Sequence, residues 1–330
     1  MNRAIYINGA SALSIQNTLR GFFPDDFVTY CQRFVQINDP DFKEYIPIMV
    51  ARRMSRIIKR AVTVSQLALQ EAQVTMPDAI IFGTGLGCIE DTEKFLSAVL
   101  DQEEQLLQPS FFIQSTHNTI ASQVAMRLGC RGYNNTLVQR RLSFESALLD
   151  MSLLFEEGSV HSVLTGGHDE LTPTYFSLLD KAGYYTYNEE LGTGSFAGEG
   201  SISFVLEDKP CAHSYALLQG MELYYTPQKE PSLDSIVLPF LRRQGVSPHE
   251  LCALFTADTA VEASFALPLQ IPFKAYCGEF FSASAFGLWM AANYLRSGSL
   301  PECRQKPYVL LHNHSLHKHH SVILLKNINR

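Results

Sequence analysis

The stretch SFESALLDMSLLFEEG at residues 143–158 decides the fold, together with SASAFGLWMAANYLRSG at residues 282–298. Each begins with serine, continues as an apolar helix of about four turns, and ends at a glycine, a residue that commonly terminates helices. A short apolar strand follows each helix, at residues 161–165 and 308–312. The shared order of helix, glycine and strand indicates a faint internal duplication.

Strands and helices alternate on both sides of these two helices. Apolar runs predict further strands at residues 4–8, 79–82, 136–138, 201–206 and 253–256. Helical spacing of apolar residues predicts further helices at residues 52–74 and 117–128. Such alternation is typical of an α/β fold with mixed sheets. The segment Lys209-Pro210-Cys211 divides the chain into two expected halves, residues 1–209 and 210–330.

Composition excludes several classes of protein. The chain has 330 residues, 46% of them hydrophobic and 18% charged, and a net charge of -7. This acidic balance disfavours a protein that binds nucleic acid or an anionic membrane. No stretch approaches the ~18 apolar residues of a membrane helix, and the N-terminus lacks a signal-peptide pattern. The seven scattered cysteines form no C-x-x-C pair, so we expect a cytoplasmic protein without a disulfide framework or zinc site.

Two motifs carry only weak functional signals. The turn GTGLG at residues 83–87 follows a strand, but it lacks the third glycine of G-x-G-x-x-G and a following Lys-Ser/Thr. We therefore expect a tight turn there in preference to a nucleotide site. The arginines and lysine between residues 52 and 60 predict a solvated helix face, with a carrier-protein contact as the alternative.

Five segments together resemble the β-ketoacyl synthases of the thiolase-like superfamily. Their order and spacing cover about two thirds of the chain, in residues 52–72, 77–96, 118–138, 147–170 and 273–301. The resemblance implies an α/β thiolase-like fold, in which two similar βαβαβαββ halves form a five-layered αβαβα sandwich. It also implies a dimer.

Active members of this family use a cysteine thiolate at the start of the first-half helix and two second-half histidines. This chain has no cysteine between Cys130 and Cys211, and Arg141 falls close to the nucleophile position. An arginine stays protonated and cannot accept an acyl group. No histidine occurs between His249 and His312, so the strand at ALFTADTA, residues 253–260, lacks the first histidine.

The second histidine normally follows a lysine by five residues. Here Lys274 is present and Glu279 occupies the histidine position. An ionised carboxylate would repel the enolate that the family stabilises. We expect Arg141, Lys274 and Glu279 to form a salt-bridged cluster in place of the catalytic residues, and Glu145 is an alternative partner of Arg141.

Other chemistry remains open for the same region. Ser143 beside His117 has the residue types for acyl transfer, whereas the alternative is a helix cap at Ser143 and a hydrogen-bonded interior His117. Glu279 as a general base is a further alternative. The segment HNHSLHKHH at residues 312–320 stands where the family has a flexible Phe/Gly loop, and we expect a strand and loop there that lines the pocket or an interface. The possible pocket residues are His117, Glu145, His312 and His314. A physiological metal at this segment is considered and not expected.

The resemblance implies a subunit of the chain-length-factor type, as in polyketide and aryl-polyene clusters. Such a subunit lacks the condensing cysteine and pairs with an active ketosynthase as a heterodimer, while a homodimer stays open. The partner would supply the thiol and contact the acyl carrier protein, and no cofactor is expected. The alternatives are an acyltransferase or malonyl decarboxylase using Ser143 or Glu279, and a non-catalytic acyl-binding scaffold.

Overall fold

The computed structural model describes most of the chain. The described residues are 3–22, 24–102, 105, 109–188, 194–226, 231–257, 269–299, 303, 305–315 and 318–328. The expected position of the first histidine, just after Ala257, lies outside these residues. No helix in these ranges is long and apolar enough to cross a membrane.

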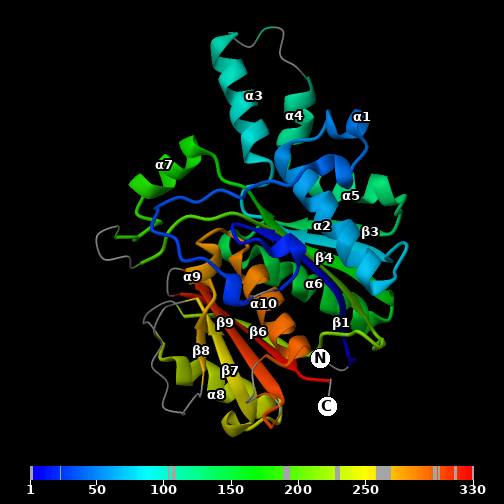
Figure 1. Cartoon of the computed structure of the whole chain (residues 1–330), viewed down its shortest axis with the longest axis vertical. Helices are drawn as coiled ribbons and strands as arrows, with labels where there is room; N and C mark the ends of the chain where they lie inside the picture. The colour runs from blue at the N-terminus through cyan, green and yellow to red at the C-terminus, as the bar shows by residue number, and fades with distance from the viewer. Residues whose placement is uncertain are drawn as a thin grey trace.

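One ten-stranded mixed sheet runs through the molecule (Figure 1). Its strands are β1 (Tyr6–Ser14), β2 (Ala79–Gly83), β3 (Tyr133–Leu137), β4 (Ser162–Asp169), β5 (Gly200–Glu207), β6 (Ala216–Tyr225), β7 (Leu251–Thr256), β8 (Gln270–Pro272), β9 (Tyr308–Ser315) and β10 (His319–Lys326).

The strand order repeats between the two ends of the sheet. The order is β3-β2-β4-β5-β1-β6-β10-β9-β7-β8, so β1 to β5 and β6 to β10 occupy equivalent places. In each set the three strands at the outer end of the sheet are parallel. In one set β2 pairs in parallel with β3 and β4, and in the other β7 pairs in parallel with β8 and β9. The two sets meet where β1 pairs with β6. This pair joins a strand of the expected half 1–209 to a strand of the expected half 210–330.

The helices complete the layers. The α-helices are α1 (Ile48–Ala51), α2 (Arg56–Ala72), α3 (Ile89–Asp101), α4 (Pro109–Ser115), α5 (Thr119–Leu128), α6 (Ser143–Glu157), α7 (Pro173–Lys181), α8 (Leu233–Arg243), α9 (Lys274–Cys277) and α10 (Ala283–Ser297). Short 3-10 turns lie at Thr18–Arg20, Pro24–Asp26, Phe42–Glu44, Arg140–Leu142 and Pro248–Glu250.

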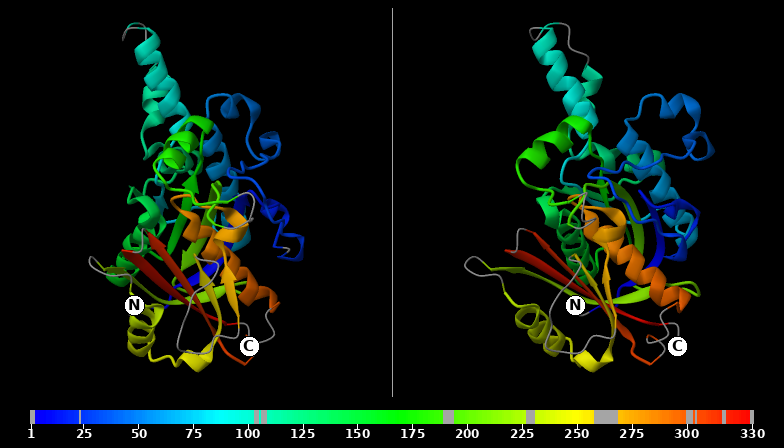
Figure 2. Two further views of the ribbon diagram at one scale, coloured as in Figure 1. Left: turned by 90° about the vertical axis from the view of Figure 1, so that its left-hand side faces the viewer. Right: turned by 60° about the vertical axis from the view of Figure 1, so that its left-hand side comes forward.

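Three apolar clusters define five layers. The helices α6 and α10 pack between the two halves of the sheet in the largest cluster. A second cluster packs α2 and α5 on the outer face of β2, β4 and β5, and a third packs α8 on β7, β9 and β10. The αβαβα arrangement expected from the resemblance is therefore confirmed. The helices α3 and α4 project from this body, as both views in Figure 2 show.

The two helices that decide the fold form as the sequence predicts. Each ends at a glycine with left-handed backbone, Gly158 at φ 75° and Gly298 at φ 64°. The helix predicted over residues 52–74 forms as α2 and begins only at Arg56, because Ser55 before it adopts extended backbone. Residues 312–315 continue strand β9 and residues 319–320 begin β10, and these two strands pair antiparallel.

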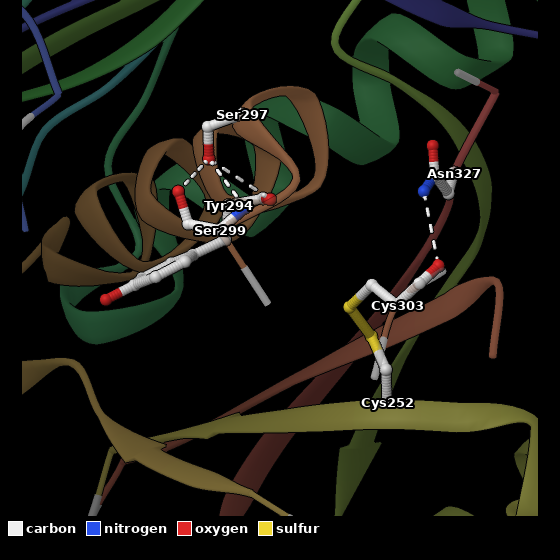
Figure 3. Close-up of a disulfide and its surroundings, with 6 residues drawn as sticks. All are labelled: Cys252, Tyr294, Ser297, Ser299, Cys303 and Asn327. Carbon is white, nitrogen blue, oxygen red and sulfur yellow. Dashed lines mark hydrogen bonds between the residues drawn. A yellow bond between two sulfur atoms is a disulfide. The ribbon is translucent and has the colours of Figure 1, made fainter. Parts of the chain in front are cut away.

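The cysteine expectation is partly wrong, because Cys252 and Cys303 form a disulfide with Cα atoms 5.1 Å apart. Cys252 lies at the start of β7, and Cys303 lies in the segment between α10 and β9 (Figure 3). Since β7 and β9 pair in parallel, the residues leading into β9 lie beside the start of β7. The two cysteines are 51 residues apart, and their spacing carries no sequence signal for pairing.

Candidate functional site

A strained turn connects β3 to the central helix α6. Arg140 has φ 52° in this turn, a left-handed conformation that is uncommon for a residue other than glycine. The Ser143 hydroxyl donates to the Arg140 carbonyl (2.7 Å) and accepts from the Gln139 N–H (2.9 Å). Ser143 therefore fixes the turn and is not the helix cap, which is Leu142. Arg140, one residue before Arg141, is the residue that the turn presents.

Arg141, Lys274 and Glu279 meet next to this turn. Lys274 Nζ lies 2.8 Å from Glu279 Oε2, and Arg141 Nε lies 3.2 Å from Glu279 Oε1. The side chains of Arg141, Lys274 and Glu279 are 13%, 10% and 8% exposed. The Arg141 guanidinium also lies 5.1 Å from the centre of the Tyr184 ring. The structure thus brings together the three residues expected to replace the catalytic groups.

The backbone of Glu279 is fixed by its neighbours. Its N–H donates to the Phe196 carbonyl (2.7 Å), and its carbonyl accepts from the Gly198 N–H (3.2 Å). Gly278 precedes it with φ 72°, and a Cβ atom there would lie 2.7 Å from the Gly198 nitrogen. Only glycine fits this close approach. The carboxylate of Glu279 is therefore held between the two cations by a rigid backbone.

Asp169, at the end of β4, joins the two halves beside this cluster. Its carboxylate accepts from Thr84 Oγ1 (3.0 Å), the Gly85 N–H (2.8 Å) and the Leu86 N–H (3.2 Å). It also accepts from the N–H (2.8 Å) and hydroxyl (2.6 Å) of Ser282, just before α10. Burial raises the pKa of Asp169, and these hydrogen bonds oppose that rise.

The glycine-rich turn is a structural element. The Asp169 carboxylate accepts hydrogen bonds from the N–H groups of Gly85 and Leu86, and Thr84 Oγ1 accepts one from the N–H of Gly87 (2.9 Å). A phosphate loop needs such N–H groups free for its ligand. The tight turn expected from the sequence is therefore the one that forms.

Glu145 does not pair with Arg141, so that alternative is wrong. Its side chain is wholly buried in α6 and accepts from Asn313 Nδ2 (2.8 Å) and Ser321 Oγ (2.9 Å). Burial raises the pKa of Glu145, and the hydrogen bonds from Asn313 and Ser321 oppose the rise. Glu145 thus links α6 to β9 and β10. Arg141 has its ion pair with Glu279 instead.

The proposed pair of Ser143 and His117 is not assembled. Ser143 is completely buried, and its hydroxyl is engaged by Gln139 and Arg140. His117 is exposed beside Gly87, which contradicts the expectation of an interior histidine. No hydrogen bond in the described ranges joins His117 to Ser143.

His312 and His314 face away from Glu145. Successive side chains in a strand point to opposite faces, and Asn313, between them, points to Glu145 on α6. His312, His314 and His320 therefore gather on the other face of the sheet, with His312 Nε2 3.2 Å from His320 Nδ1. The expectation that His312 and His314 line the same pocket is thus wrong. Within the described residues, no group of three His, Cys, Asp or Glu side chains has the geometry of a metal site.

An apolar hollow of about 530 Å³ lies between α3 and α7. It begins at Gly85 and Leu86, next to the turn that Asp169 holds. The side chains that make it apolar are Leu86, Ile89, Leu96, Leu100 and Leu178. Its polar lining includes Glu93 and His117. The arrangement suits a chain-like apolar ligand, because most of the lining surface is hydrocarbon.

The fold and the position of this cluster define the class of the protein as ketosynthase-like. A family model described as "Beta-ketoacyl synthase, N-terminal domain" matches residues 31–212, more than half of the chain. The chain therefore belongs to the β-ketoacyl synthase family.

Known proteins agree with this assignment. The 3-oxoacyl-(acyl-carrier-protein) synthase 2 of Synechocystis sp. is 23% identical over 212 residues, which cover 59% of this chain and 50% of the relative. This chain thus spans about half the length of that relative. The structure titled "The ishigamide ketosynthase/chain length factor" matches with a TM-score of 0.77 and 17% identity over 100% of both chains. A ketosynthase (ApeO) in complex with its chain length factor (ApeC) from Xenorhabdus doucetiae matches with a TM-score of 0.72, 16% identity and 98% of each chain.

Two residues of the site were not found by sequence reasoning. Asp169 is the last residue of the buried strand β4, and a carboxylate at such a strand end was its available signal. Arg140 had no such signal, because its conformation depends on the hydrogen bonds of Ser143.

Proposed function

We propose that this chain is a non-condensing, chain-length-factor-type subunit that pairs with an active β-ketoacyl synthase. The observation that carries the proposal is the ion-paired cluster of Arg141, Lys274 and Glu279. A condensing enzyme needs a thiolate and enolate-stabilising donors at this place. A protonated arginine and an ion-paired carboxylate supply neither.

The competing enzymatic functions have less support. An acyl-transferring Ser143 needs a general base and access to substrate, but its hydroxyl is buried and closes the Arg140 turn. A general base must reach the proton that it removes, whereas both oxygens of Glu279 face cations. These contacts favour a structural role for Ser143 and Glu279.

The surface around β3 supports pairing with another subunit. This strand is at the edge of the sheet, and its outer N–H and C=O groups have no strand partner in the described part of the chain. Large apolar side chains are exposed on α5, on β3 and just after it, and on α6, at Met126, Tyr133, Val138, Leu149 and Leu153. Edge strands with apolar surroundings are usually covered in natural proteins. We expect the interface to bury more than about 2,000 Å² in total.

The hollow between α3 and α7 gives this subunit a role in the pair. An acyl chain made by the partner would enter it beside Leu86 and lie along its apolar side chains, of which Leu96 and Leu100 are exposed. The partner would hold the thiol and receive the acyl carrier protein, and the pair would work in the cytoplasm in polyketide, polyene or fatty-acid-type synthesis.

Co-expression with a cysteine-containing ketosynthase from the same genome tests the proposal. We expect the two chains to co-purify, and condensation of acyl and malonyl carrier proteins to require the partner's cysteine. This chain alone should release no condensed product. Condensation or malonyl decarboxylation by this chain alone would support the enzymatic alternatives. Acyl binding without any ketosynthase partner would support a scaffold.

A further inference from the structure

Two arginines flank the exposed edge strand β3. Arg131 lies two residues before the strand and Arg140 three residues after it, and both side chains are exposed. None of the ion pairs in the described ranges includes Arg131 or Arg140. The nearby acid Asp150 lies by the strand itself, where it accepts from the neutral groups of Tyr133 (3.1 Å) and Asn135 (3.0 Å). Each end of the edge therefore has a positive charge that no ion pair of the described residues neutralises.

The turn after β3 holds one of these charges in place. Arg140 keeps its left-handed backbone because the Ser143 hydroxyl bonds to both sides of it. Such strain persists only where the surrounding structure enforces it, and it is concentrated at functional positions. The enforced conformation presents a long cationic side chain at the end of an open strand.

Pairing of β3 with a second copy of itself would bring these charges together. A two-fold axis makes the same surface meet itself, and antiparallel pairing centred on Asn135 places Tyr133 opposite Leu137. The same axis brings the segment just before β3 of one copy, which carries Arg131, towards the turn just after β3 of the other, which carries Arg140. This contact occurs twice, once on each side of the axis. Like charges brought close together at an interface repel, and the repulsion grows as water is excluded from between them.

We propose that Arg131 and Arg140 select the partner of this subunit: they oppose self-pairing and bind carboxylates on the matching edge of a different subunit. This inference rests on the proposed function, because it assumes pairing through β3. It specifies the chemistry of the partner as a ketosynthase-fold edge with acidic side chains at both ends.

Charge-reversal variants of the chain alone test the like-charge contact. The Arg140→Glu variant places a carboxylate next to Arg131 of the second copy, so self-dimerisation should strengthen about tenfold in sedimentation velocity at low salt. The Arg131→Glu variant should do the same. The double variant restores like charges and should return to the wild-type self-association. Equal self-association in all four proteins would overturn the inference.

Two controls show whether a change in self-association comes from the altered charge or from a disturbed turn at Arg140. Raising the salt from about 0.05 to 0.5 M should strengthen self-association of the wild type and weaken that of the Arg140→Glu variant, because salt screens both contacts. Arg131 is not in a strained turn, so Arg131→Glu keeps the test valid if Arg140→Glu does not fold. A tight wild-type self-dimer that is insensitive to salt would contradict the charge argument.

Pairing with the intact ketosynthase separates this inference from the proposed function. If the wild type pairs and Arg140→Glu weakens that pairing about tenfold, both stand. If the wild type pairs and both charge reversals leave the affinity unchanged, the inference fails while the proposed function stands. If the wild type does not pair with the ketosynthase, the proposed function fails, and the inference fails with it.

Discussion

Removing the charge of Glu279 should destabilise the protein by an amount that its burial determines. The Glu279→Gln variant keeps the shape of the side chain but leaves Arg141 and Lys274 without their shared anion. All three side chains are at most 13% exposed, so water screens the cations poorly. Breaking a buried ion pair costs about 3–5 kcal/mol. Because Arg141 retains its contact with Tyr184, we expect the lower end, about 3 kcal/mol.

Urea denaturation followed by circular dichroism measures this loss. For a chain of this length the same loss lowers Tm by about 4 °C. The matched control is Glu222→Gln, which breaks a solvent-exposed pair with Arg243 and should destabilise the protein clearly less than Glu279→Gln. The Lys274→Met/Glu279→Gln double variant should lose less stability than the sum of the single variants, because it leaves one fewer unpaired charge.

A result in which Glu279→Gln is no more destabilising than Glu222→Gln would refute the buried-pair reasoning. If Glu279→Gln is also thermally silent yet abolishes an activity of the wild type, the carboxylate is catalytic. The decarboxylase or acyltransferase alternative would then replace the proposed function.

Three further predictions follow from single features of the structure. Burial raises the pKa of Glu170 from 4.5 to about 7, so the folded state holds this proton more tightly than the unfolded state. Stability should therefore fall by up to about 3 kcal/mol as the pH rises from 4.5 to 7, and Glu170→Gln should remove this fall in urea titrations. The disulfide joins residues 51 apart, so Cys303→Ser should cost about 4 kcal/mol in non-reducing buffer, whereas Cys31→Ser, at an exposed free thiol, should change nothing. A cerulenin-type inhibitor should add no mass to the peptide 136–150, which has no cysteine, and an adduct there would contradict the non-condensing assignment.

The sequence predicts the helices and strands that a pattern of apolar residues within a short stretch of chain is enough to define. The helices at residues 143–157 and 283–297 have apolar spacing and a terminal glycine, and both form. The strands β2, β4, β5, β7 and β9 arise from short apolar runs and lie close to their expected places. The sequence did not predict β6, where buried and half-buried positions alternate only in its first part, or β10, whose first residues are histidines.

Features that depend on distant contacts were predicted poorly. The cluster of Arg141, Lys274 and Glu279 was found only because the family resemblance fixes the spacing of those positions. The disulfide and the links made by Asp169 join residues far apart in the chain, and residue types alone do not specify such pairs. The orientation of His312 and His314 required knowledge that residues 308–315 continue as a strand.

The contacts of Asp169 affect whether the two repeats of this chain could be expressed as separate fragments. Its carboxylate is wholly buried and bonds to Gly85 in one repeat and to Ser282 in the other. A polypeptide that ended between the repeats would leave this acid without its donors from Ser282, and the separate second repeat would lack the acceptor that orders the start of α10. Two fragments expressed together would have to dock around one carboxylate before either became stable. We therefore expect the two repeats to fold as a single unit, despite their common pattern.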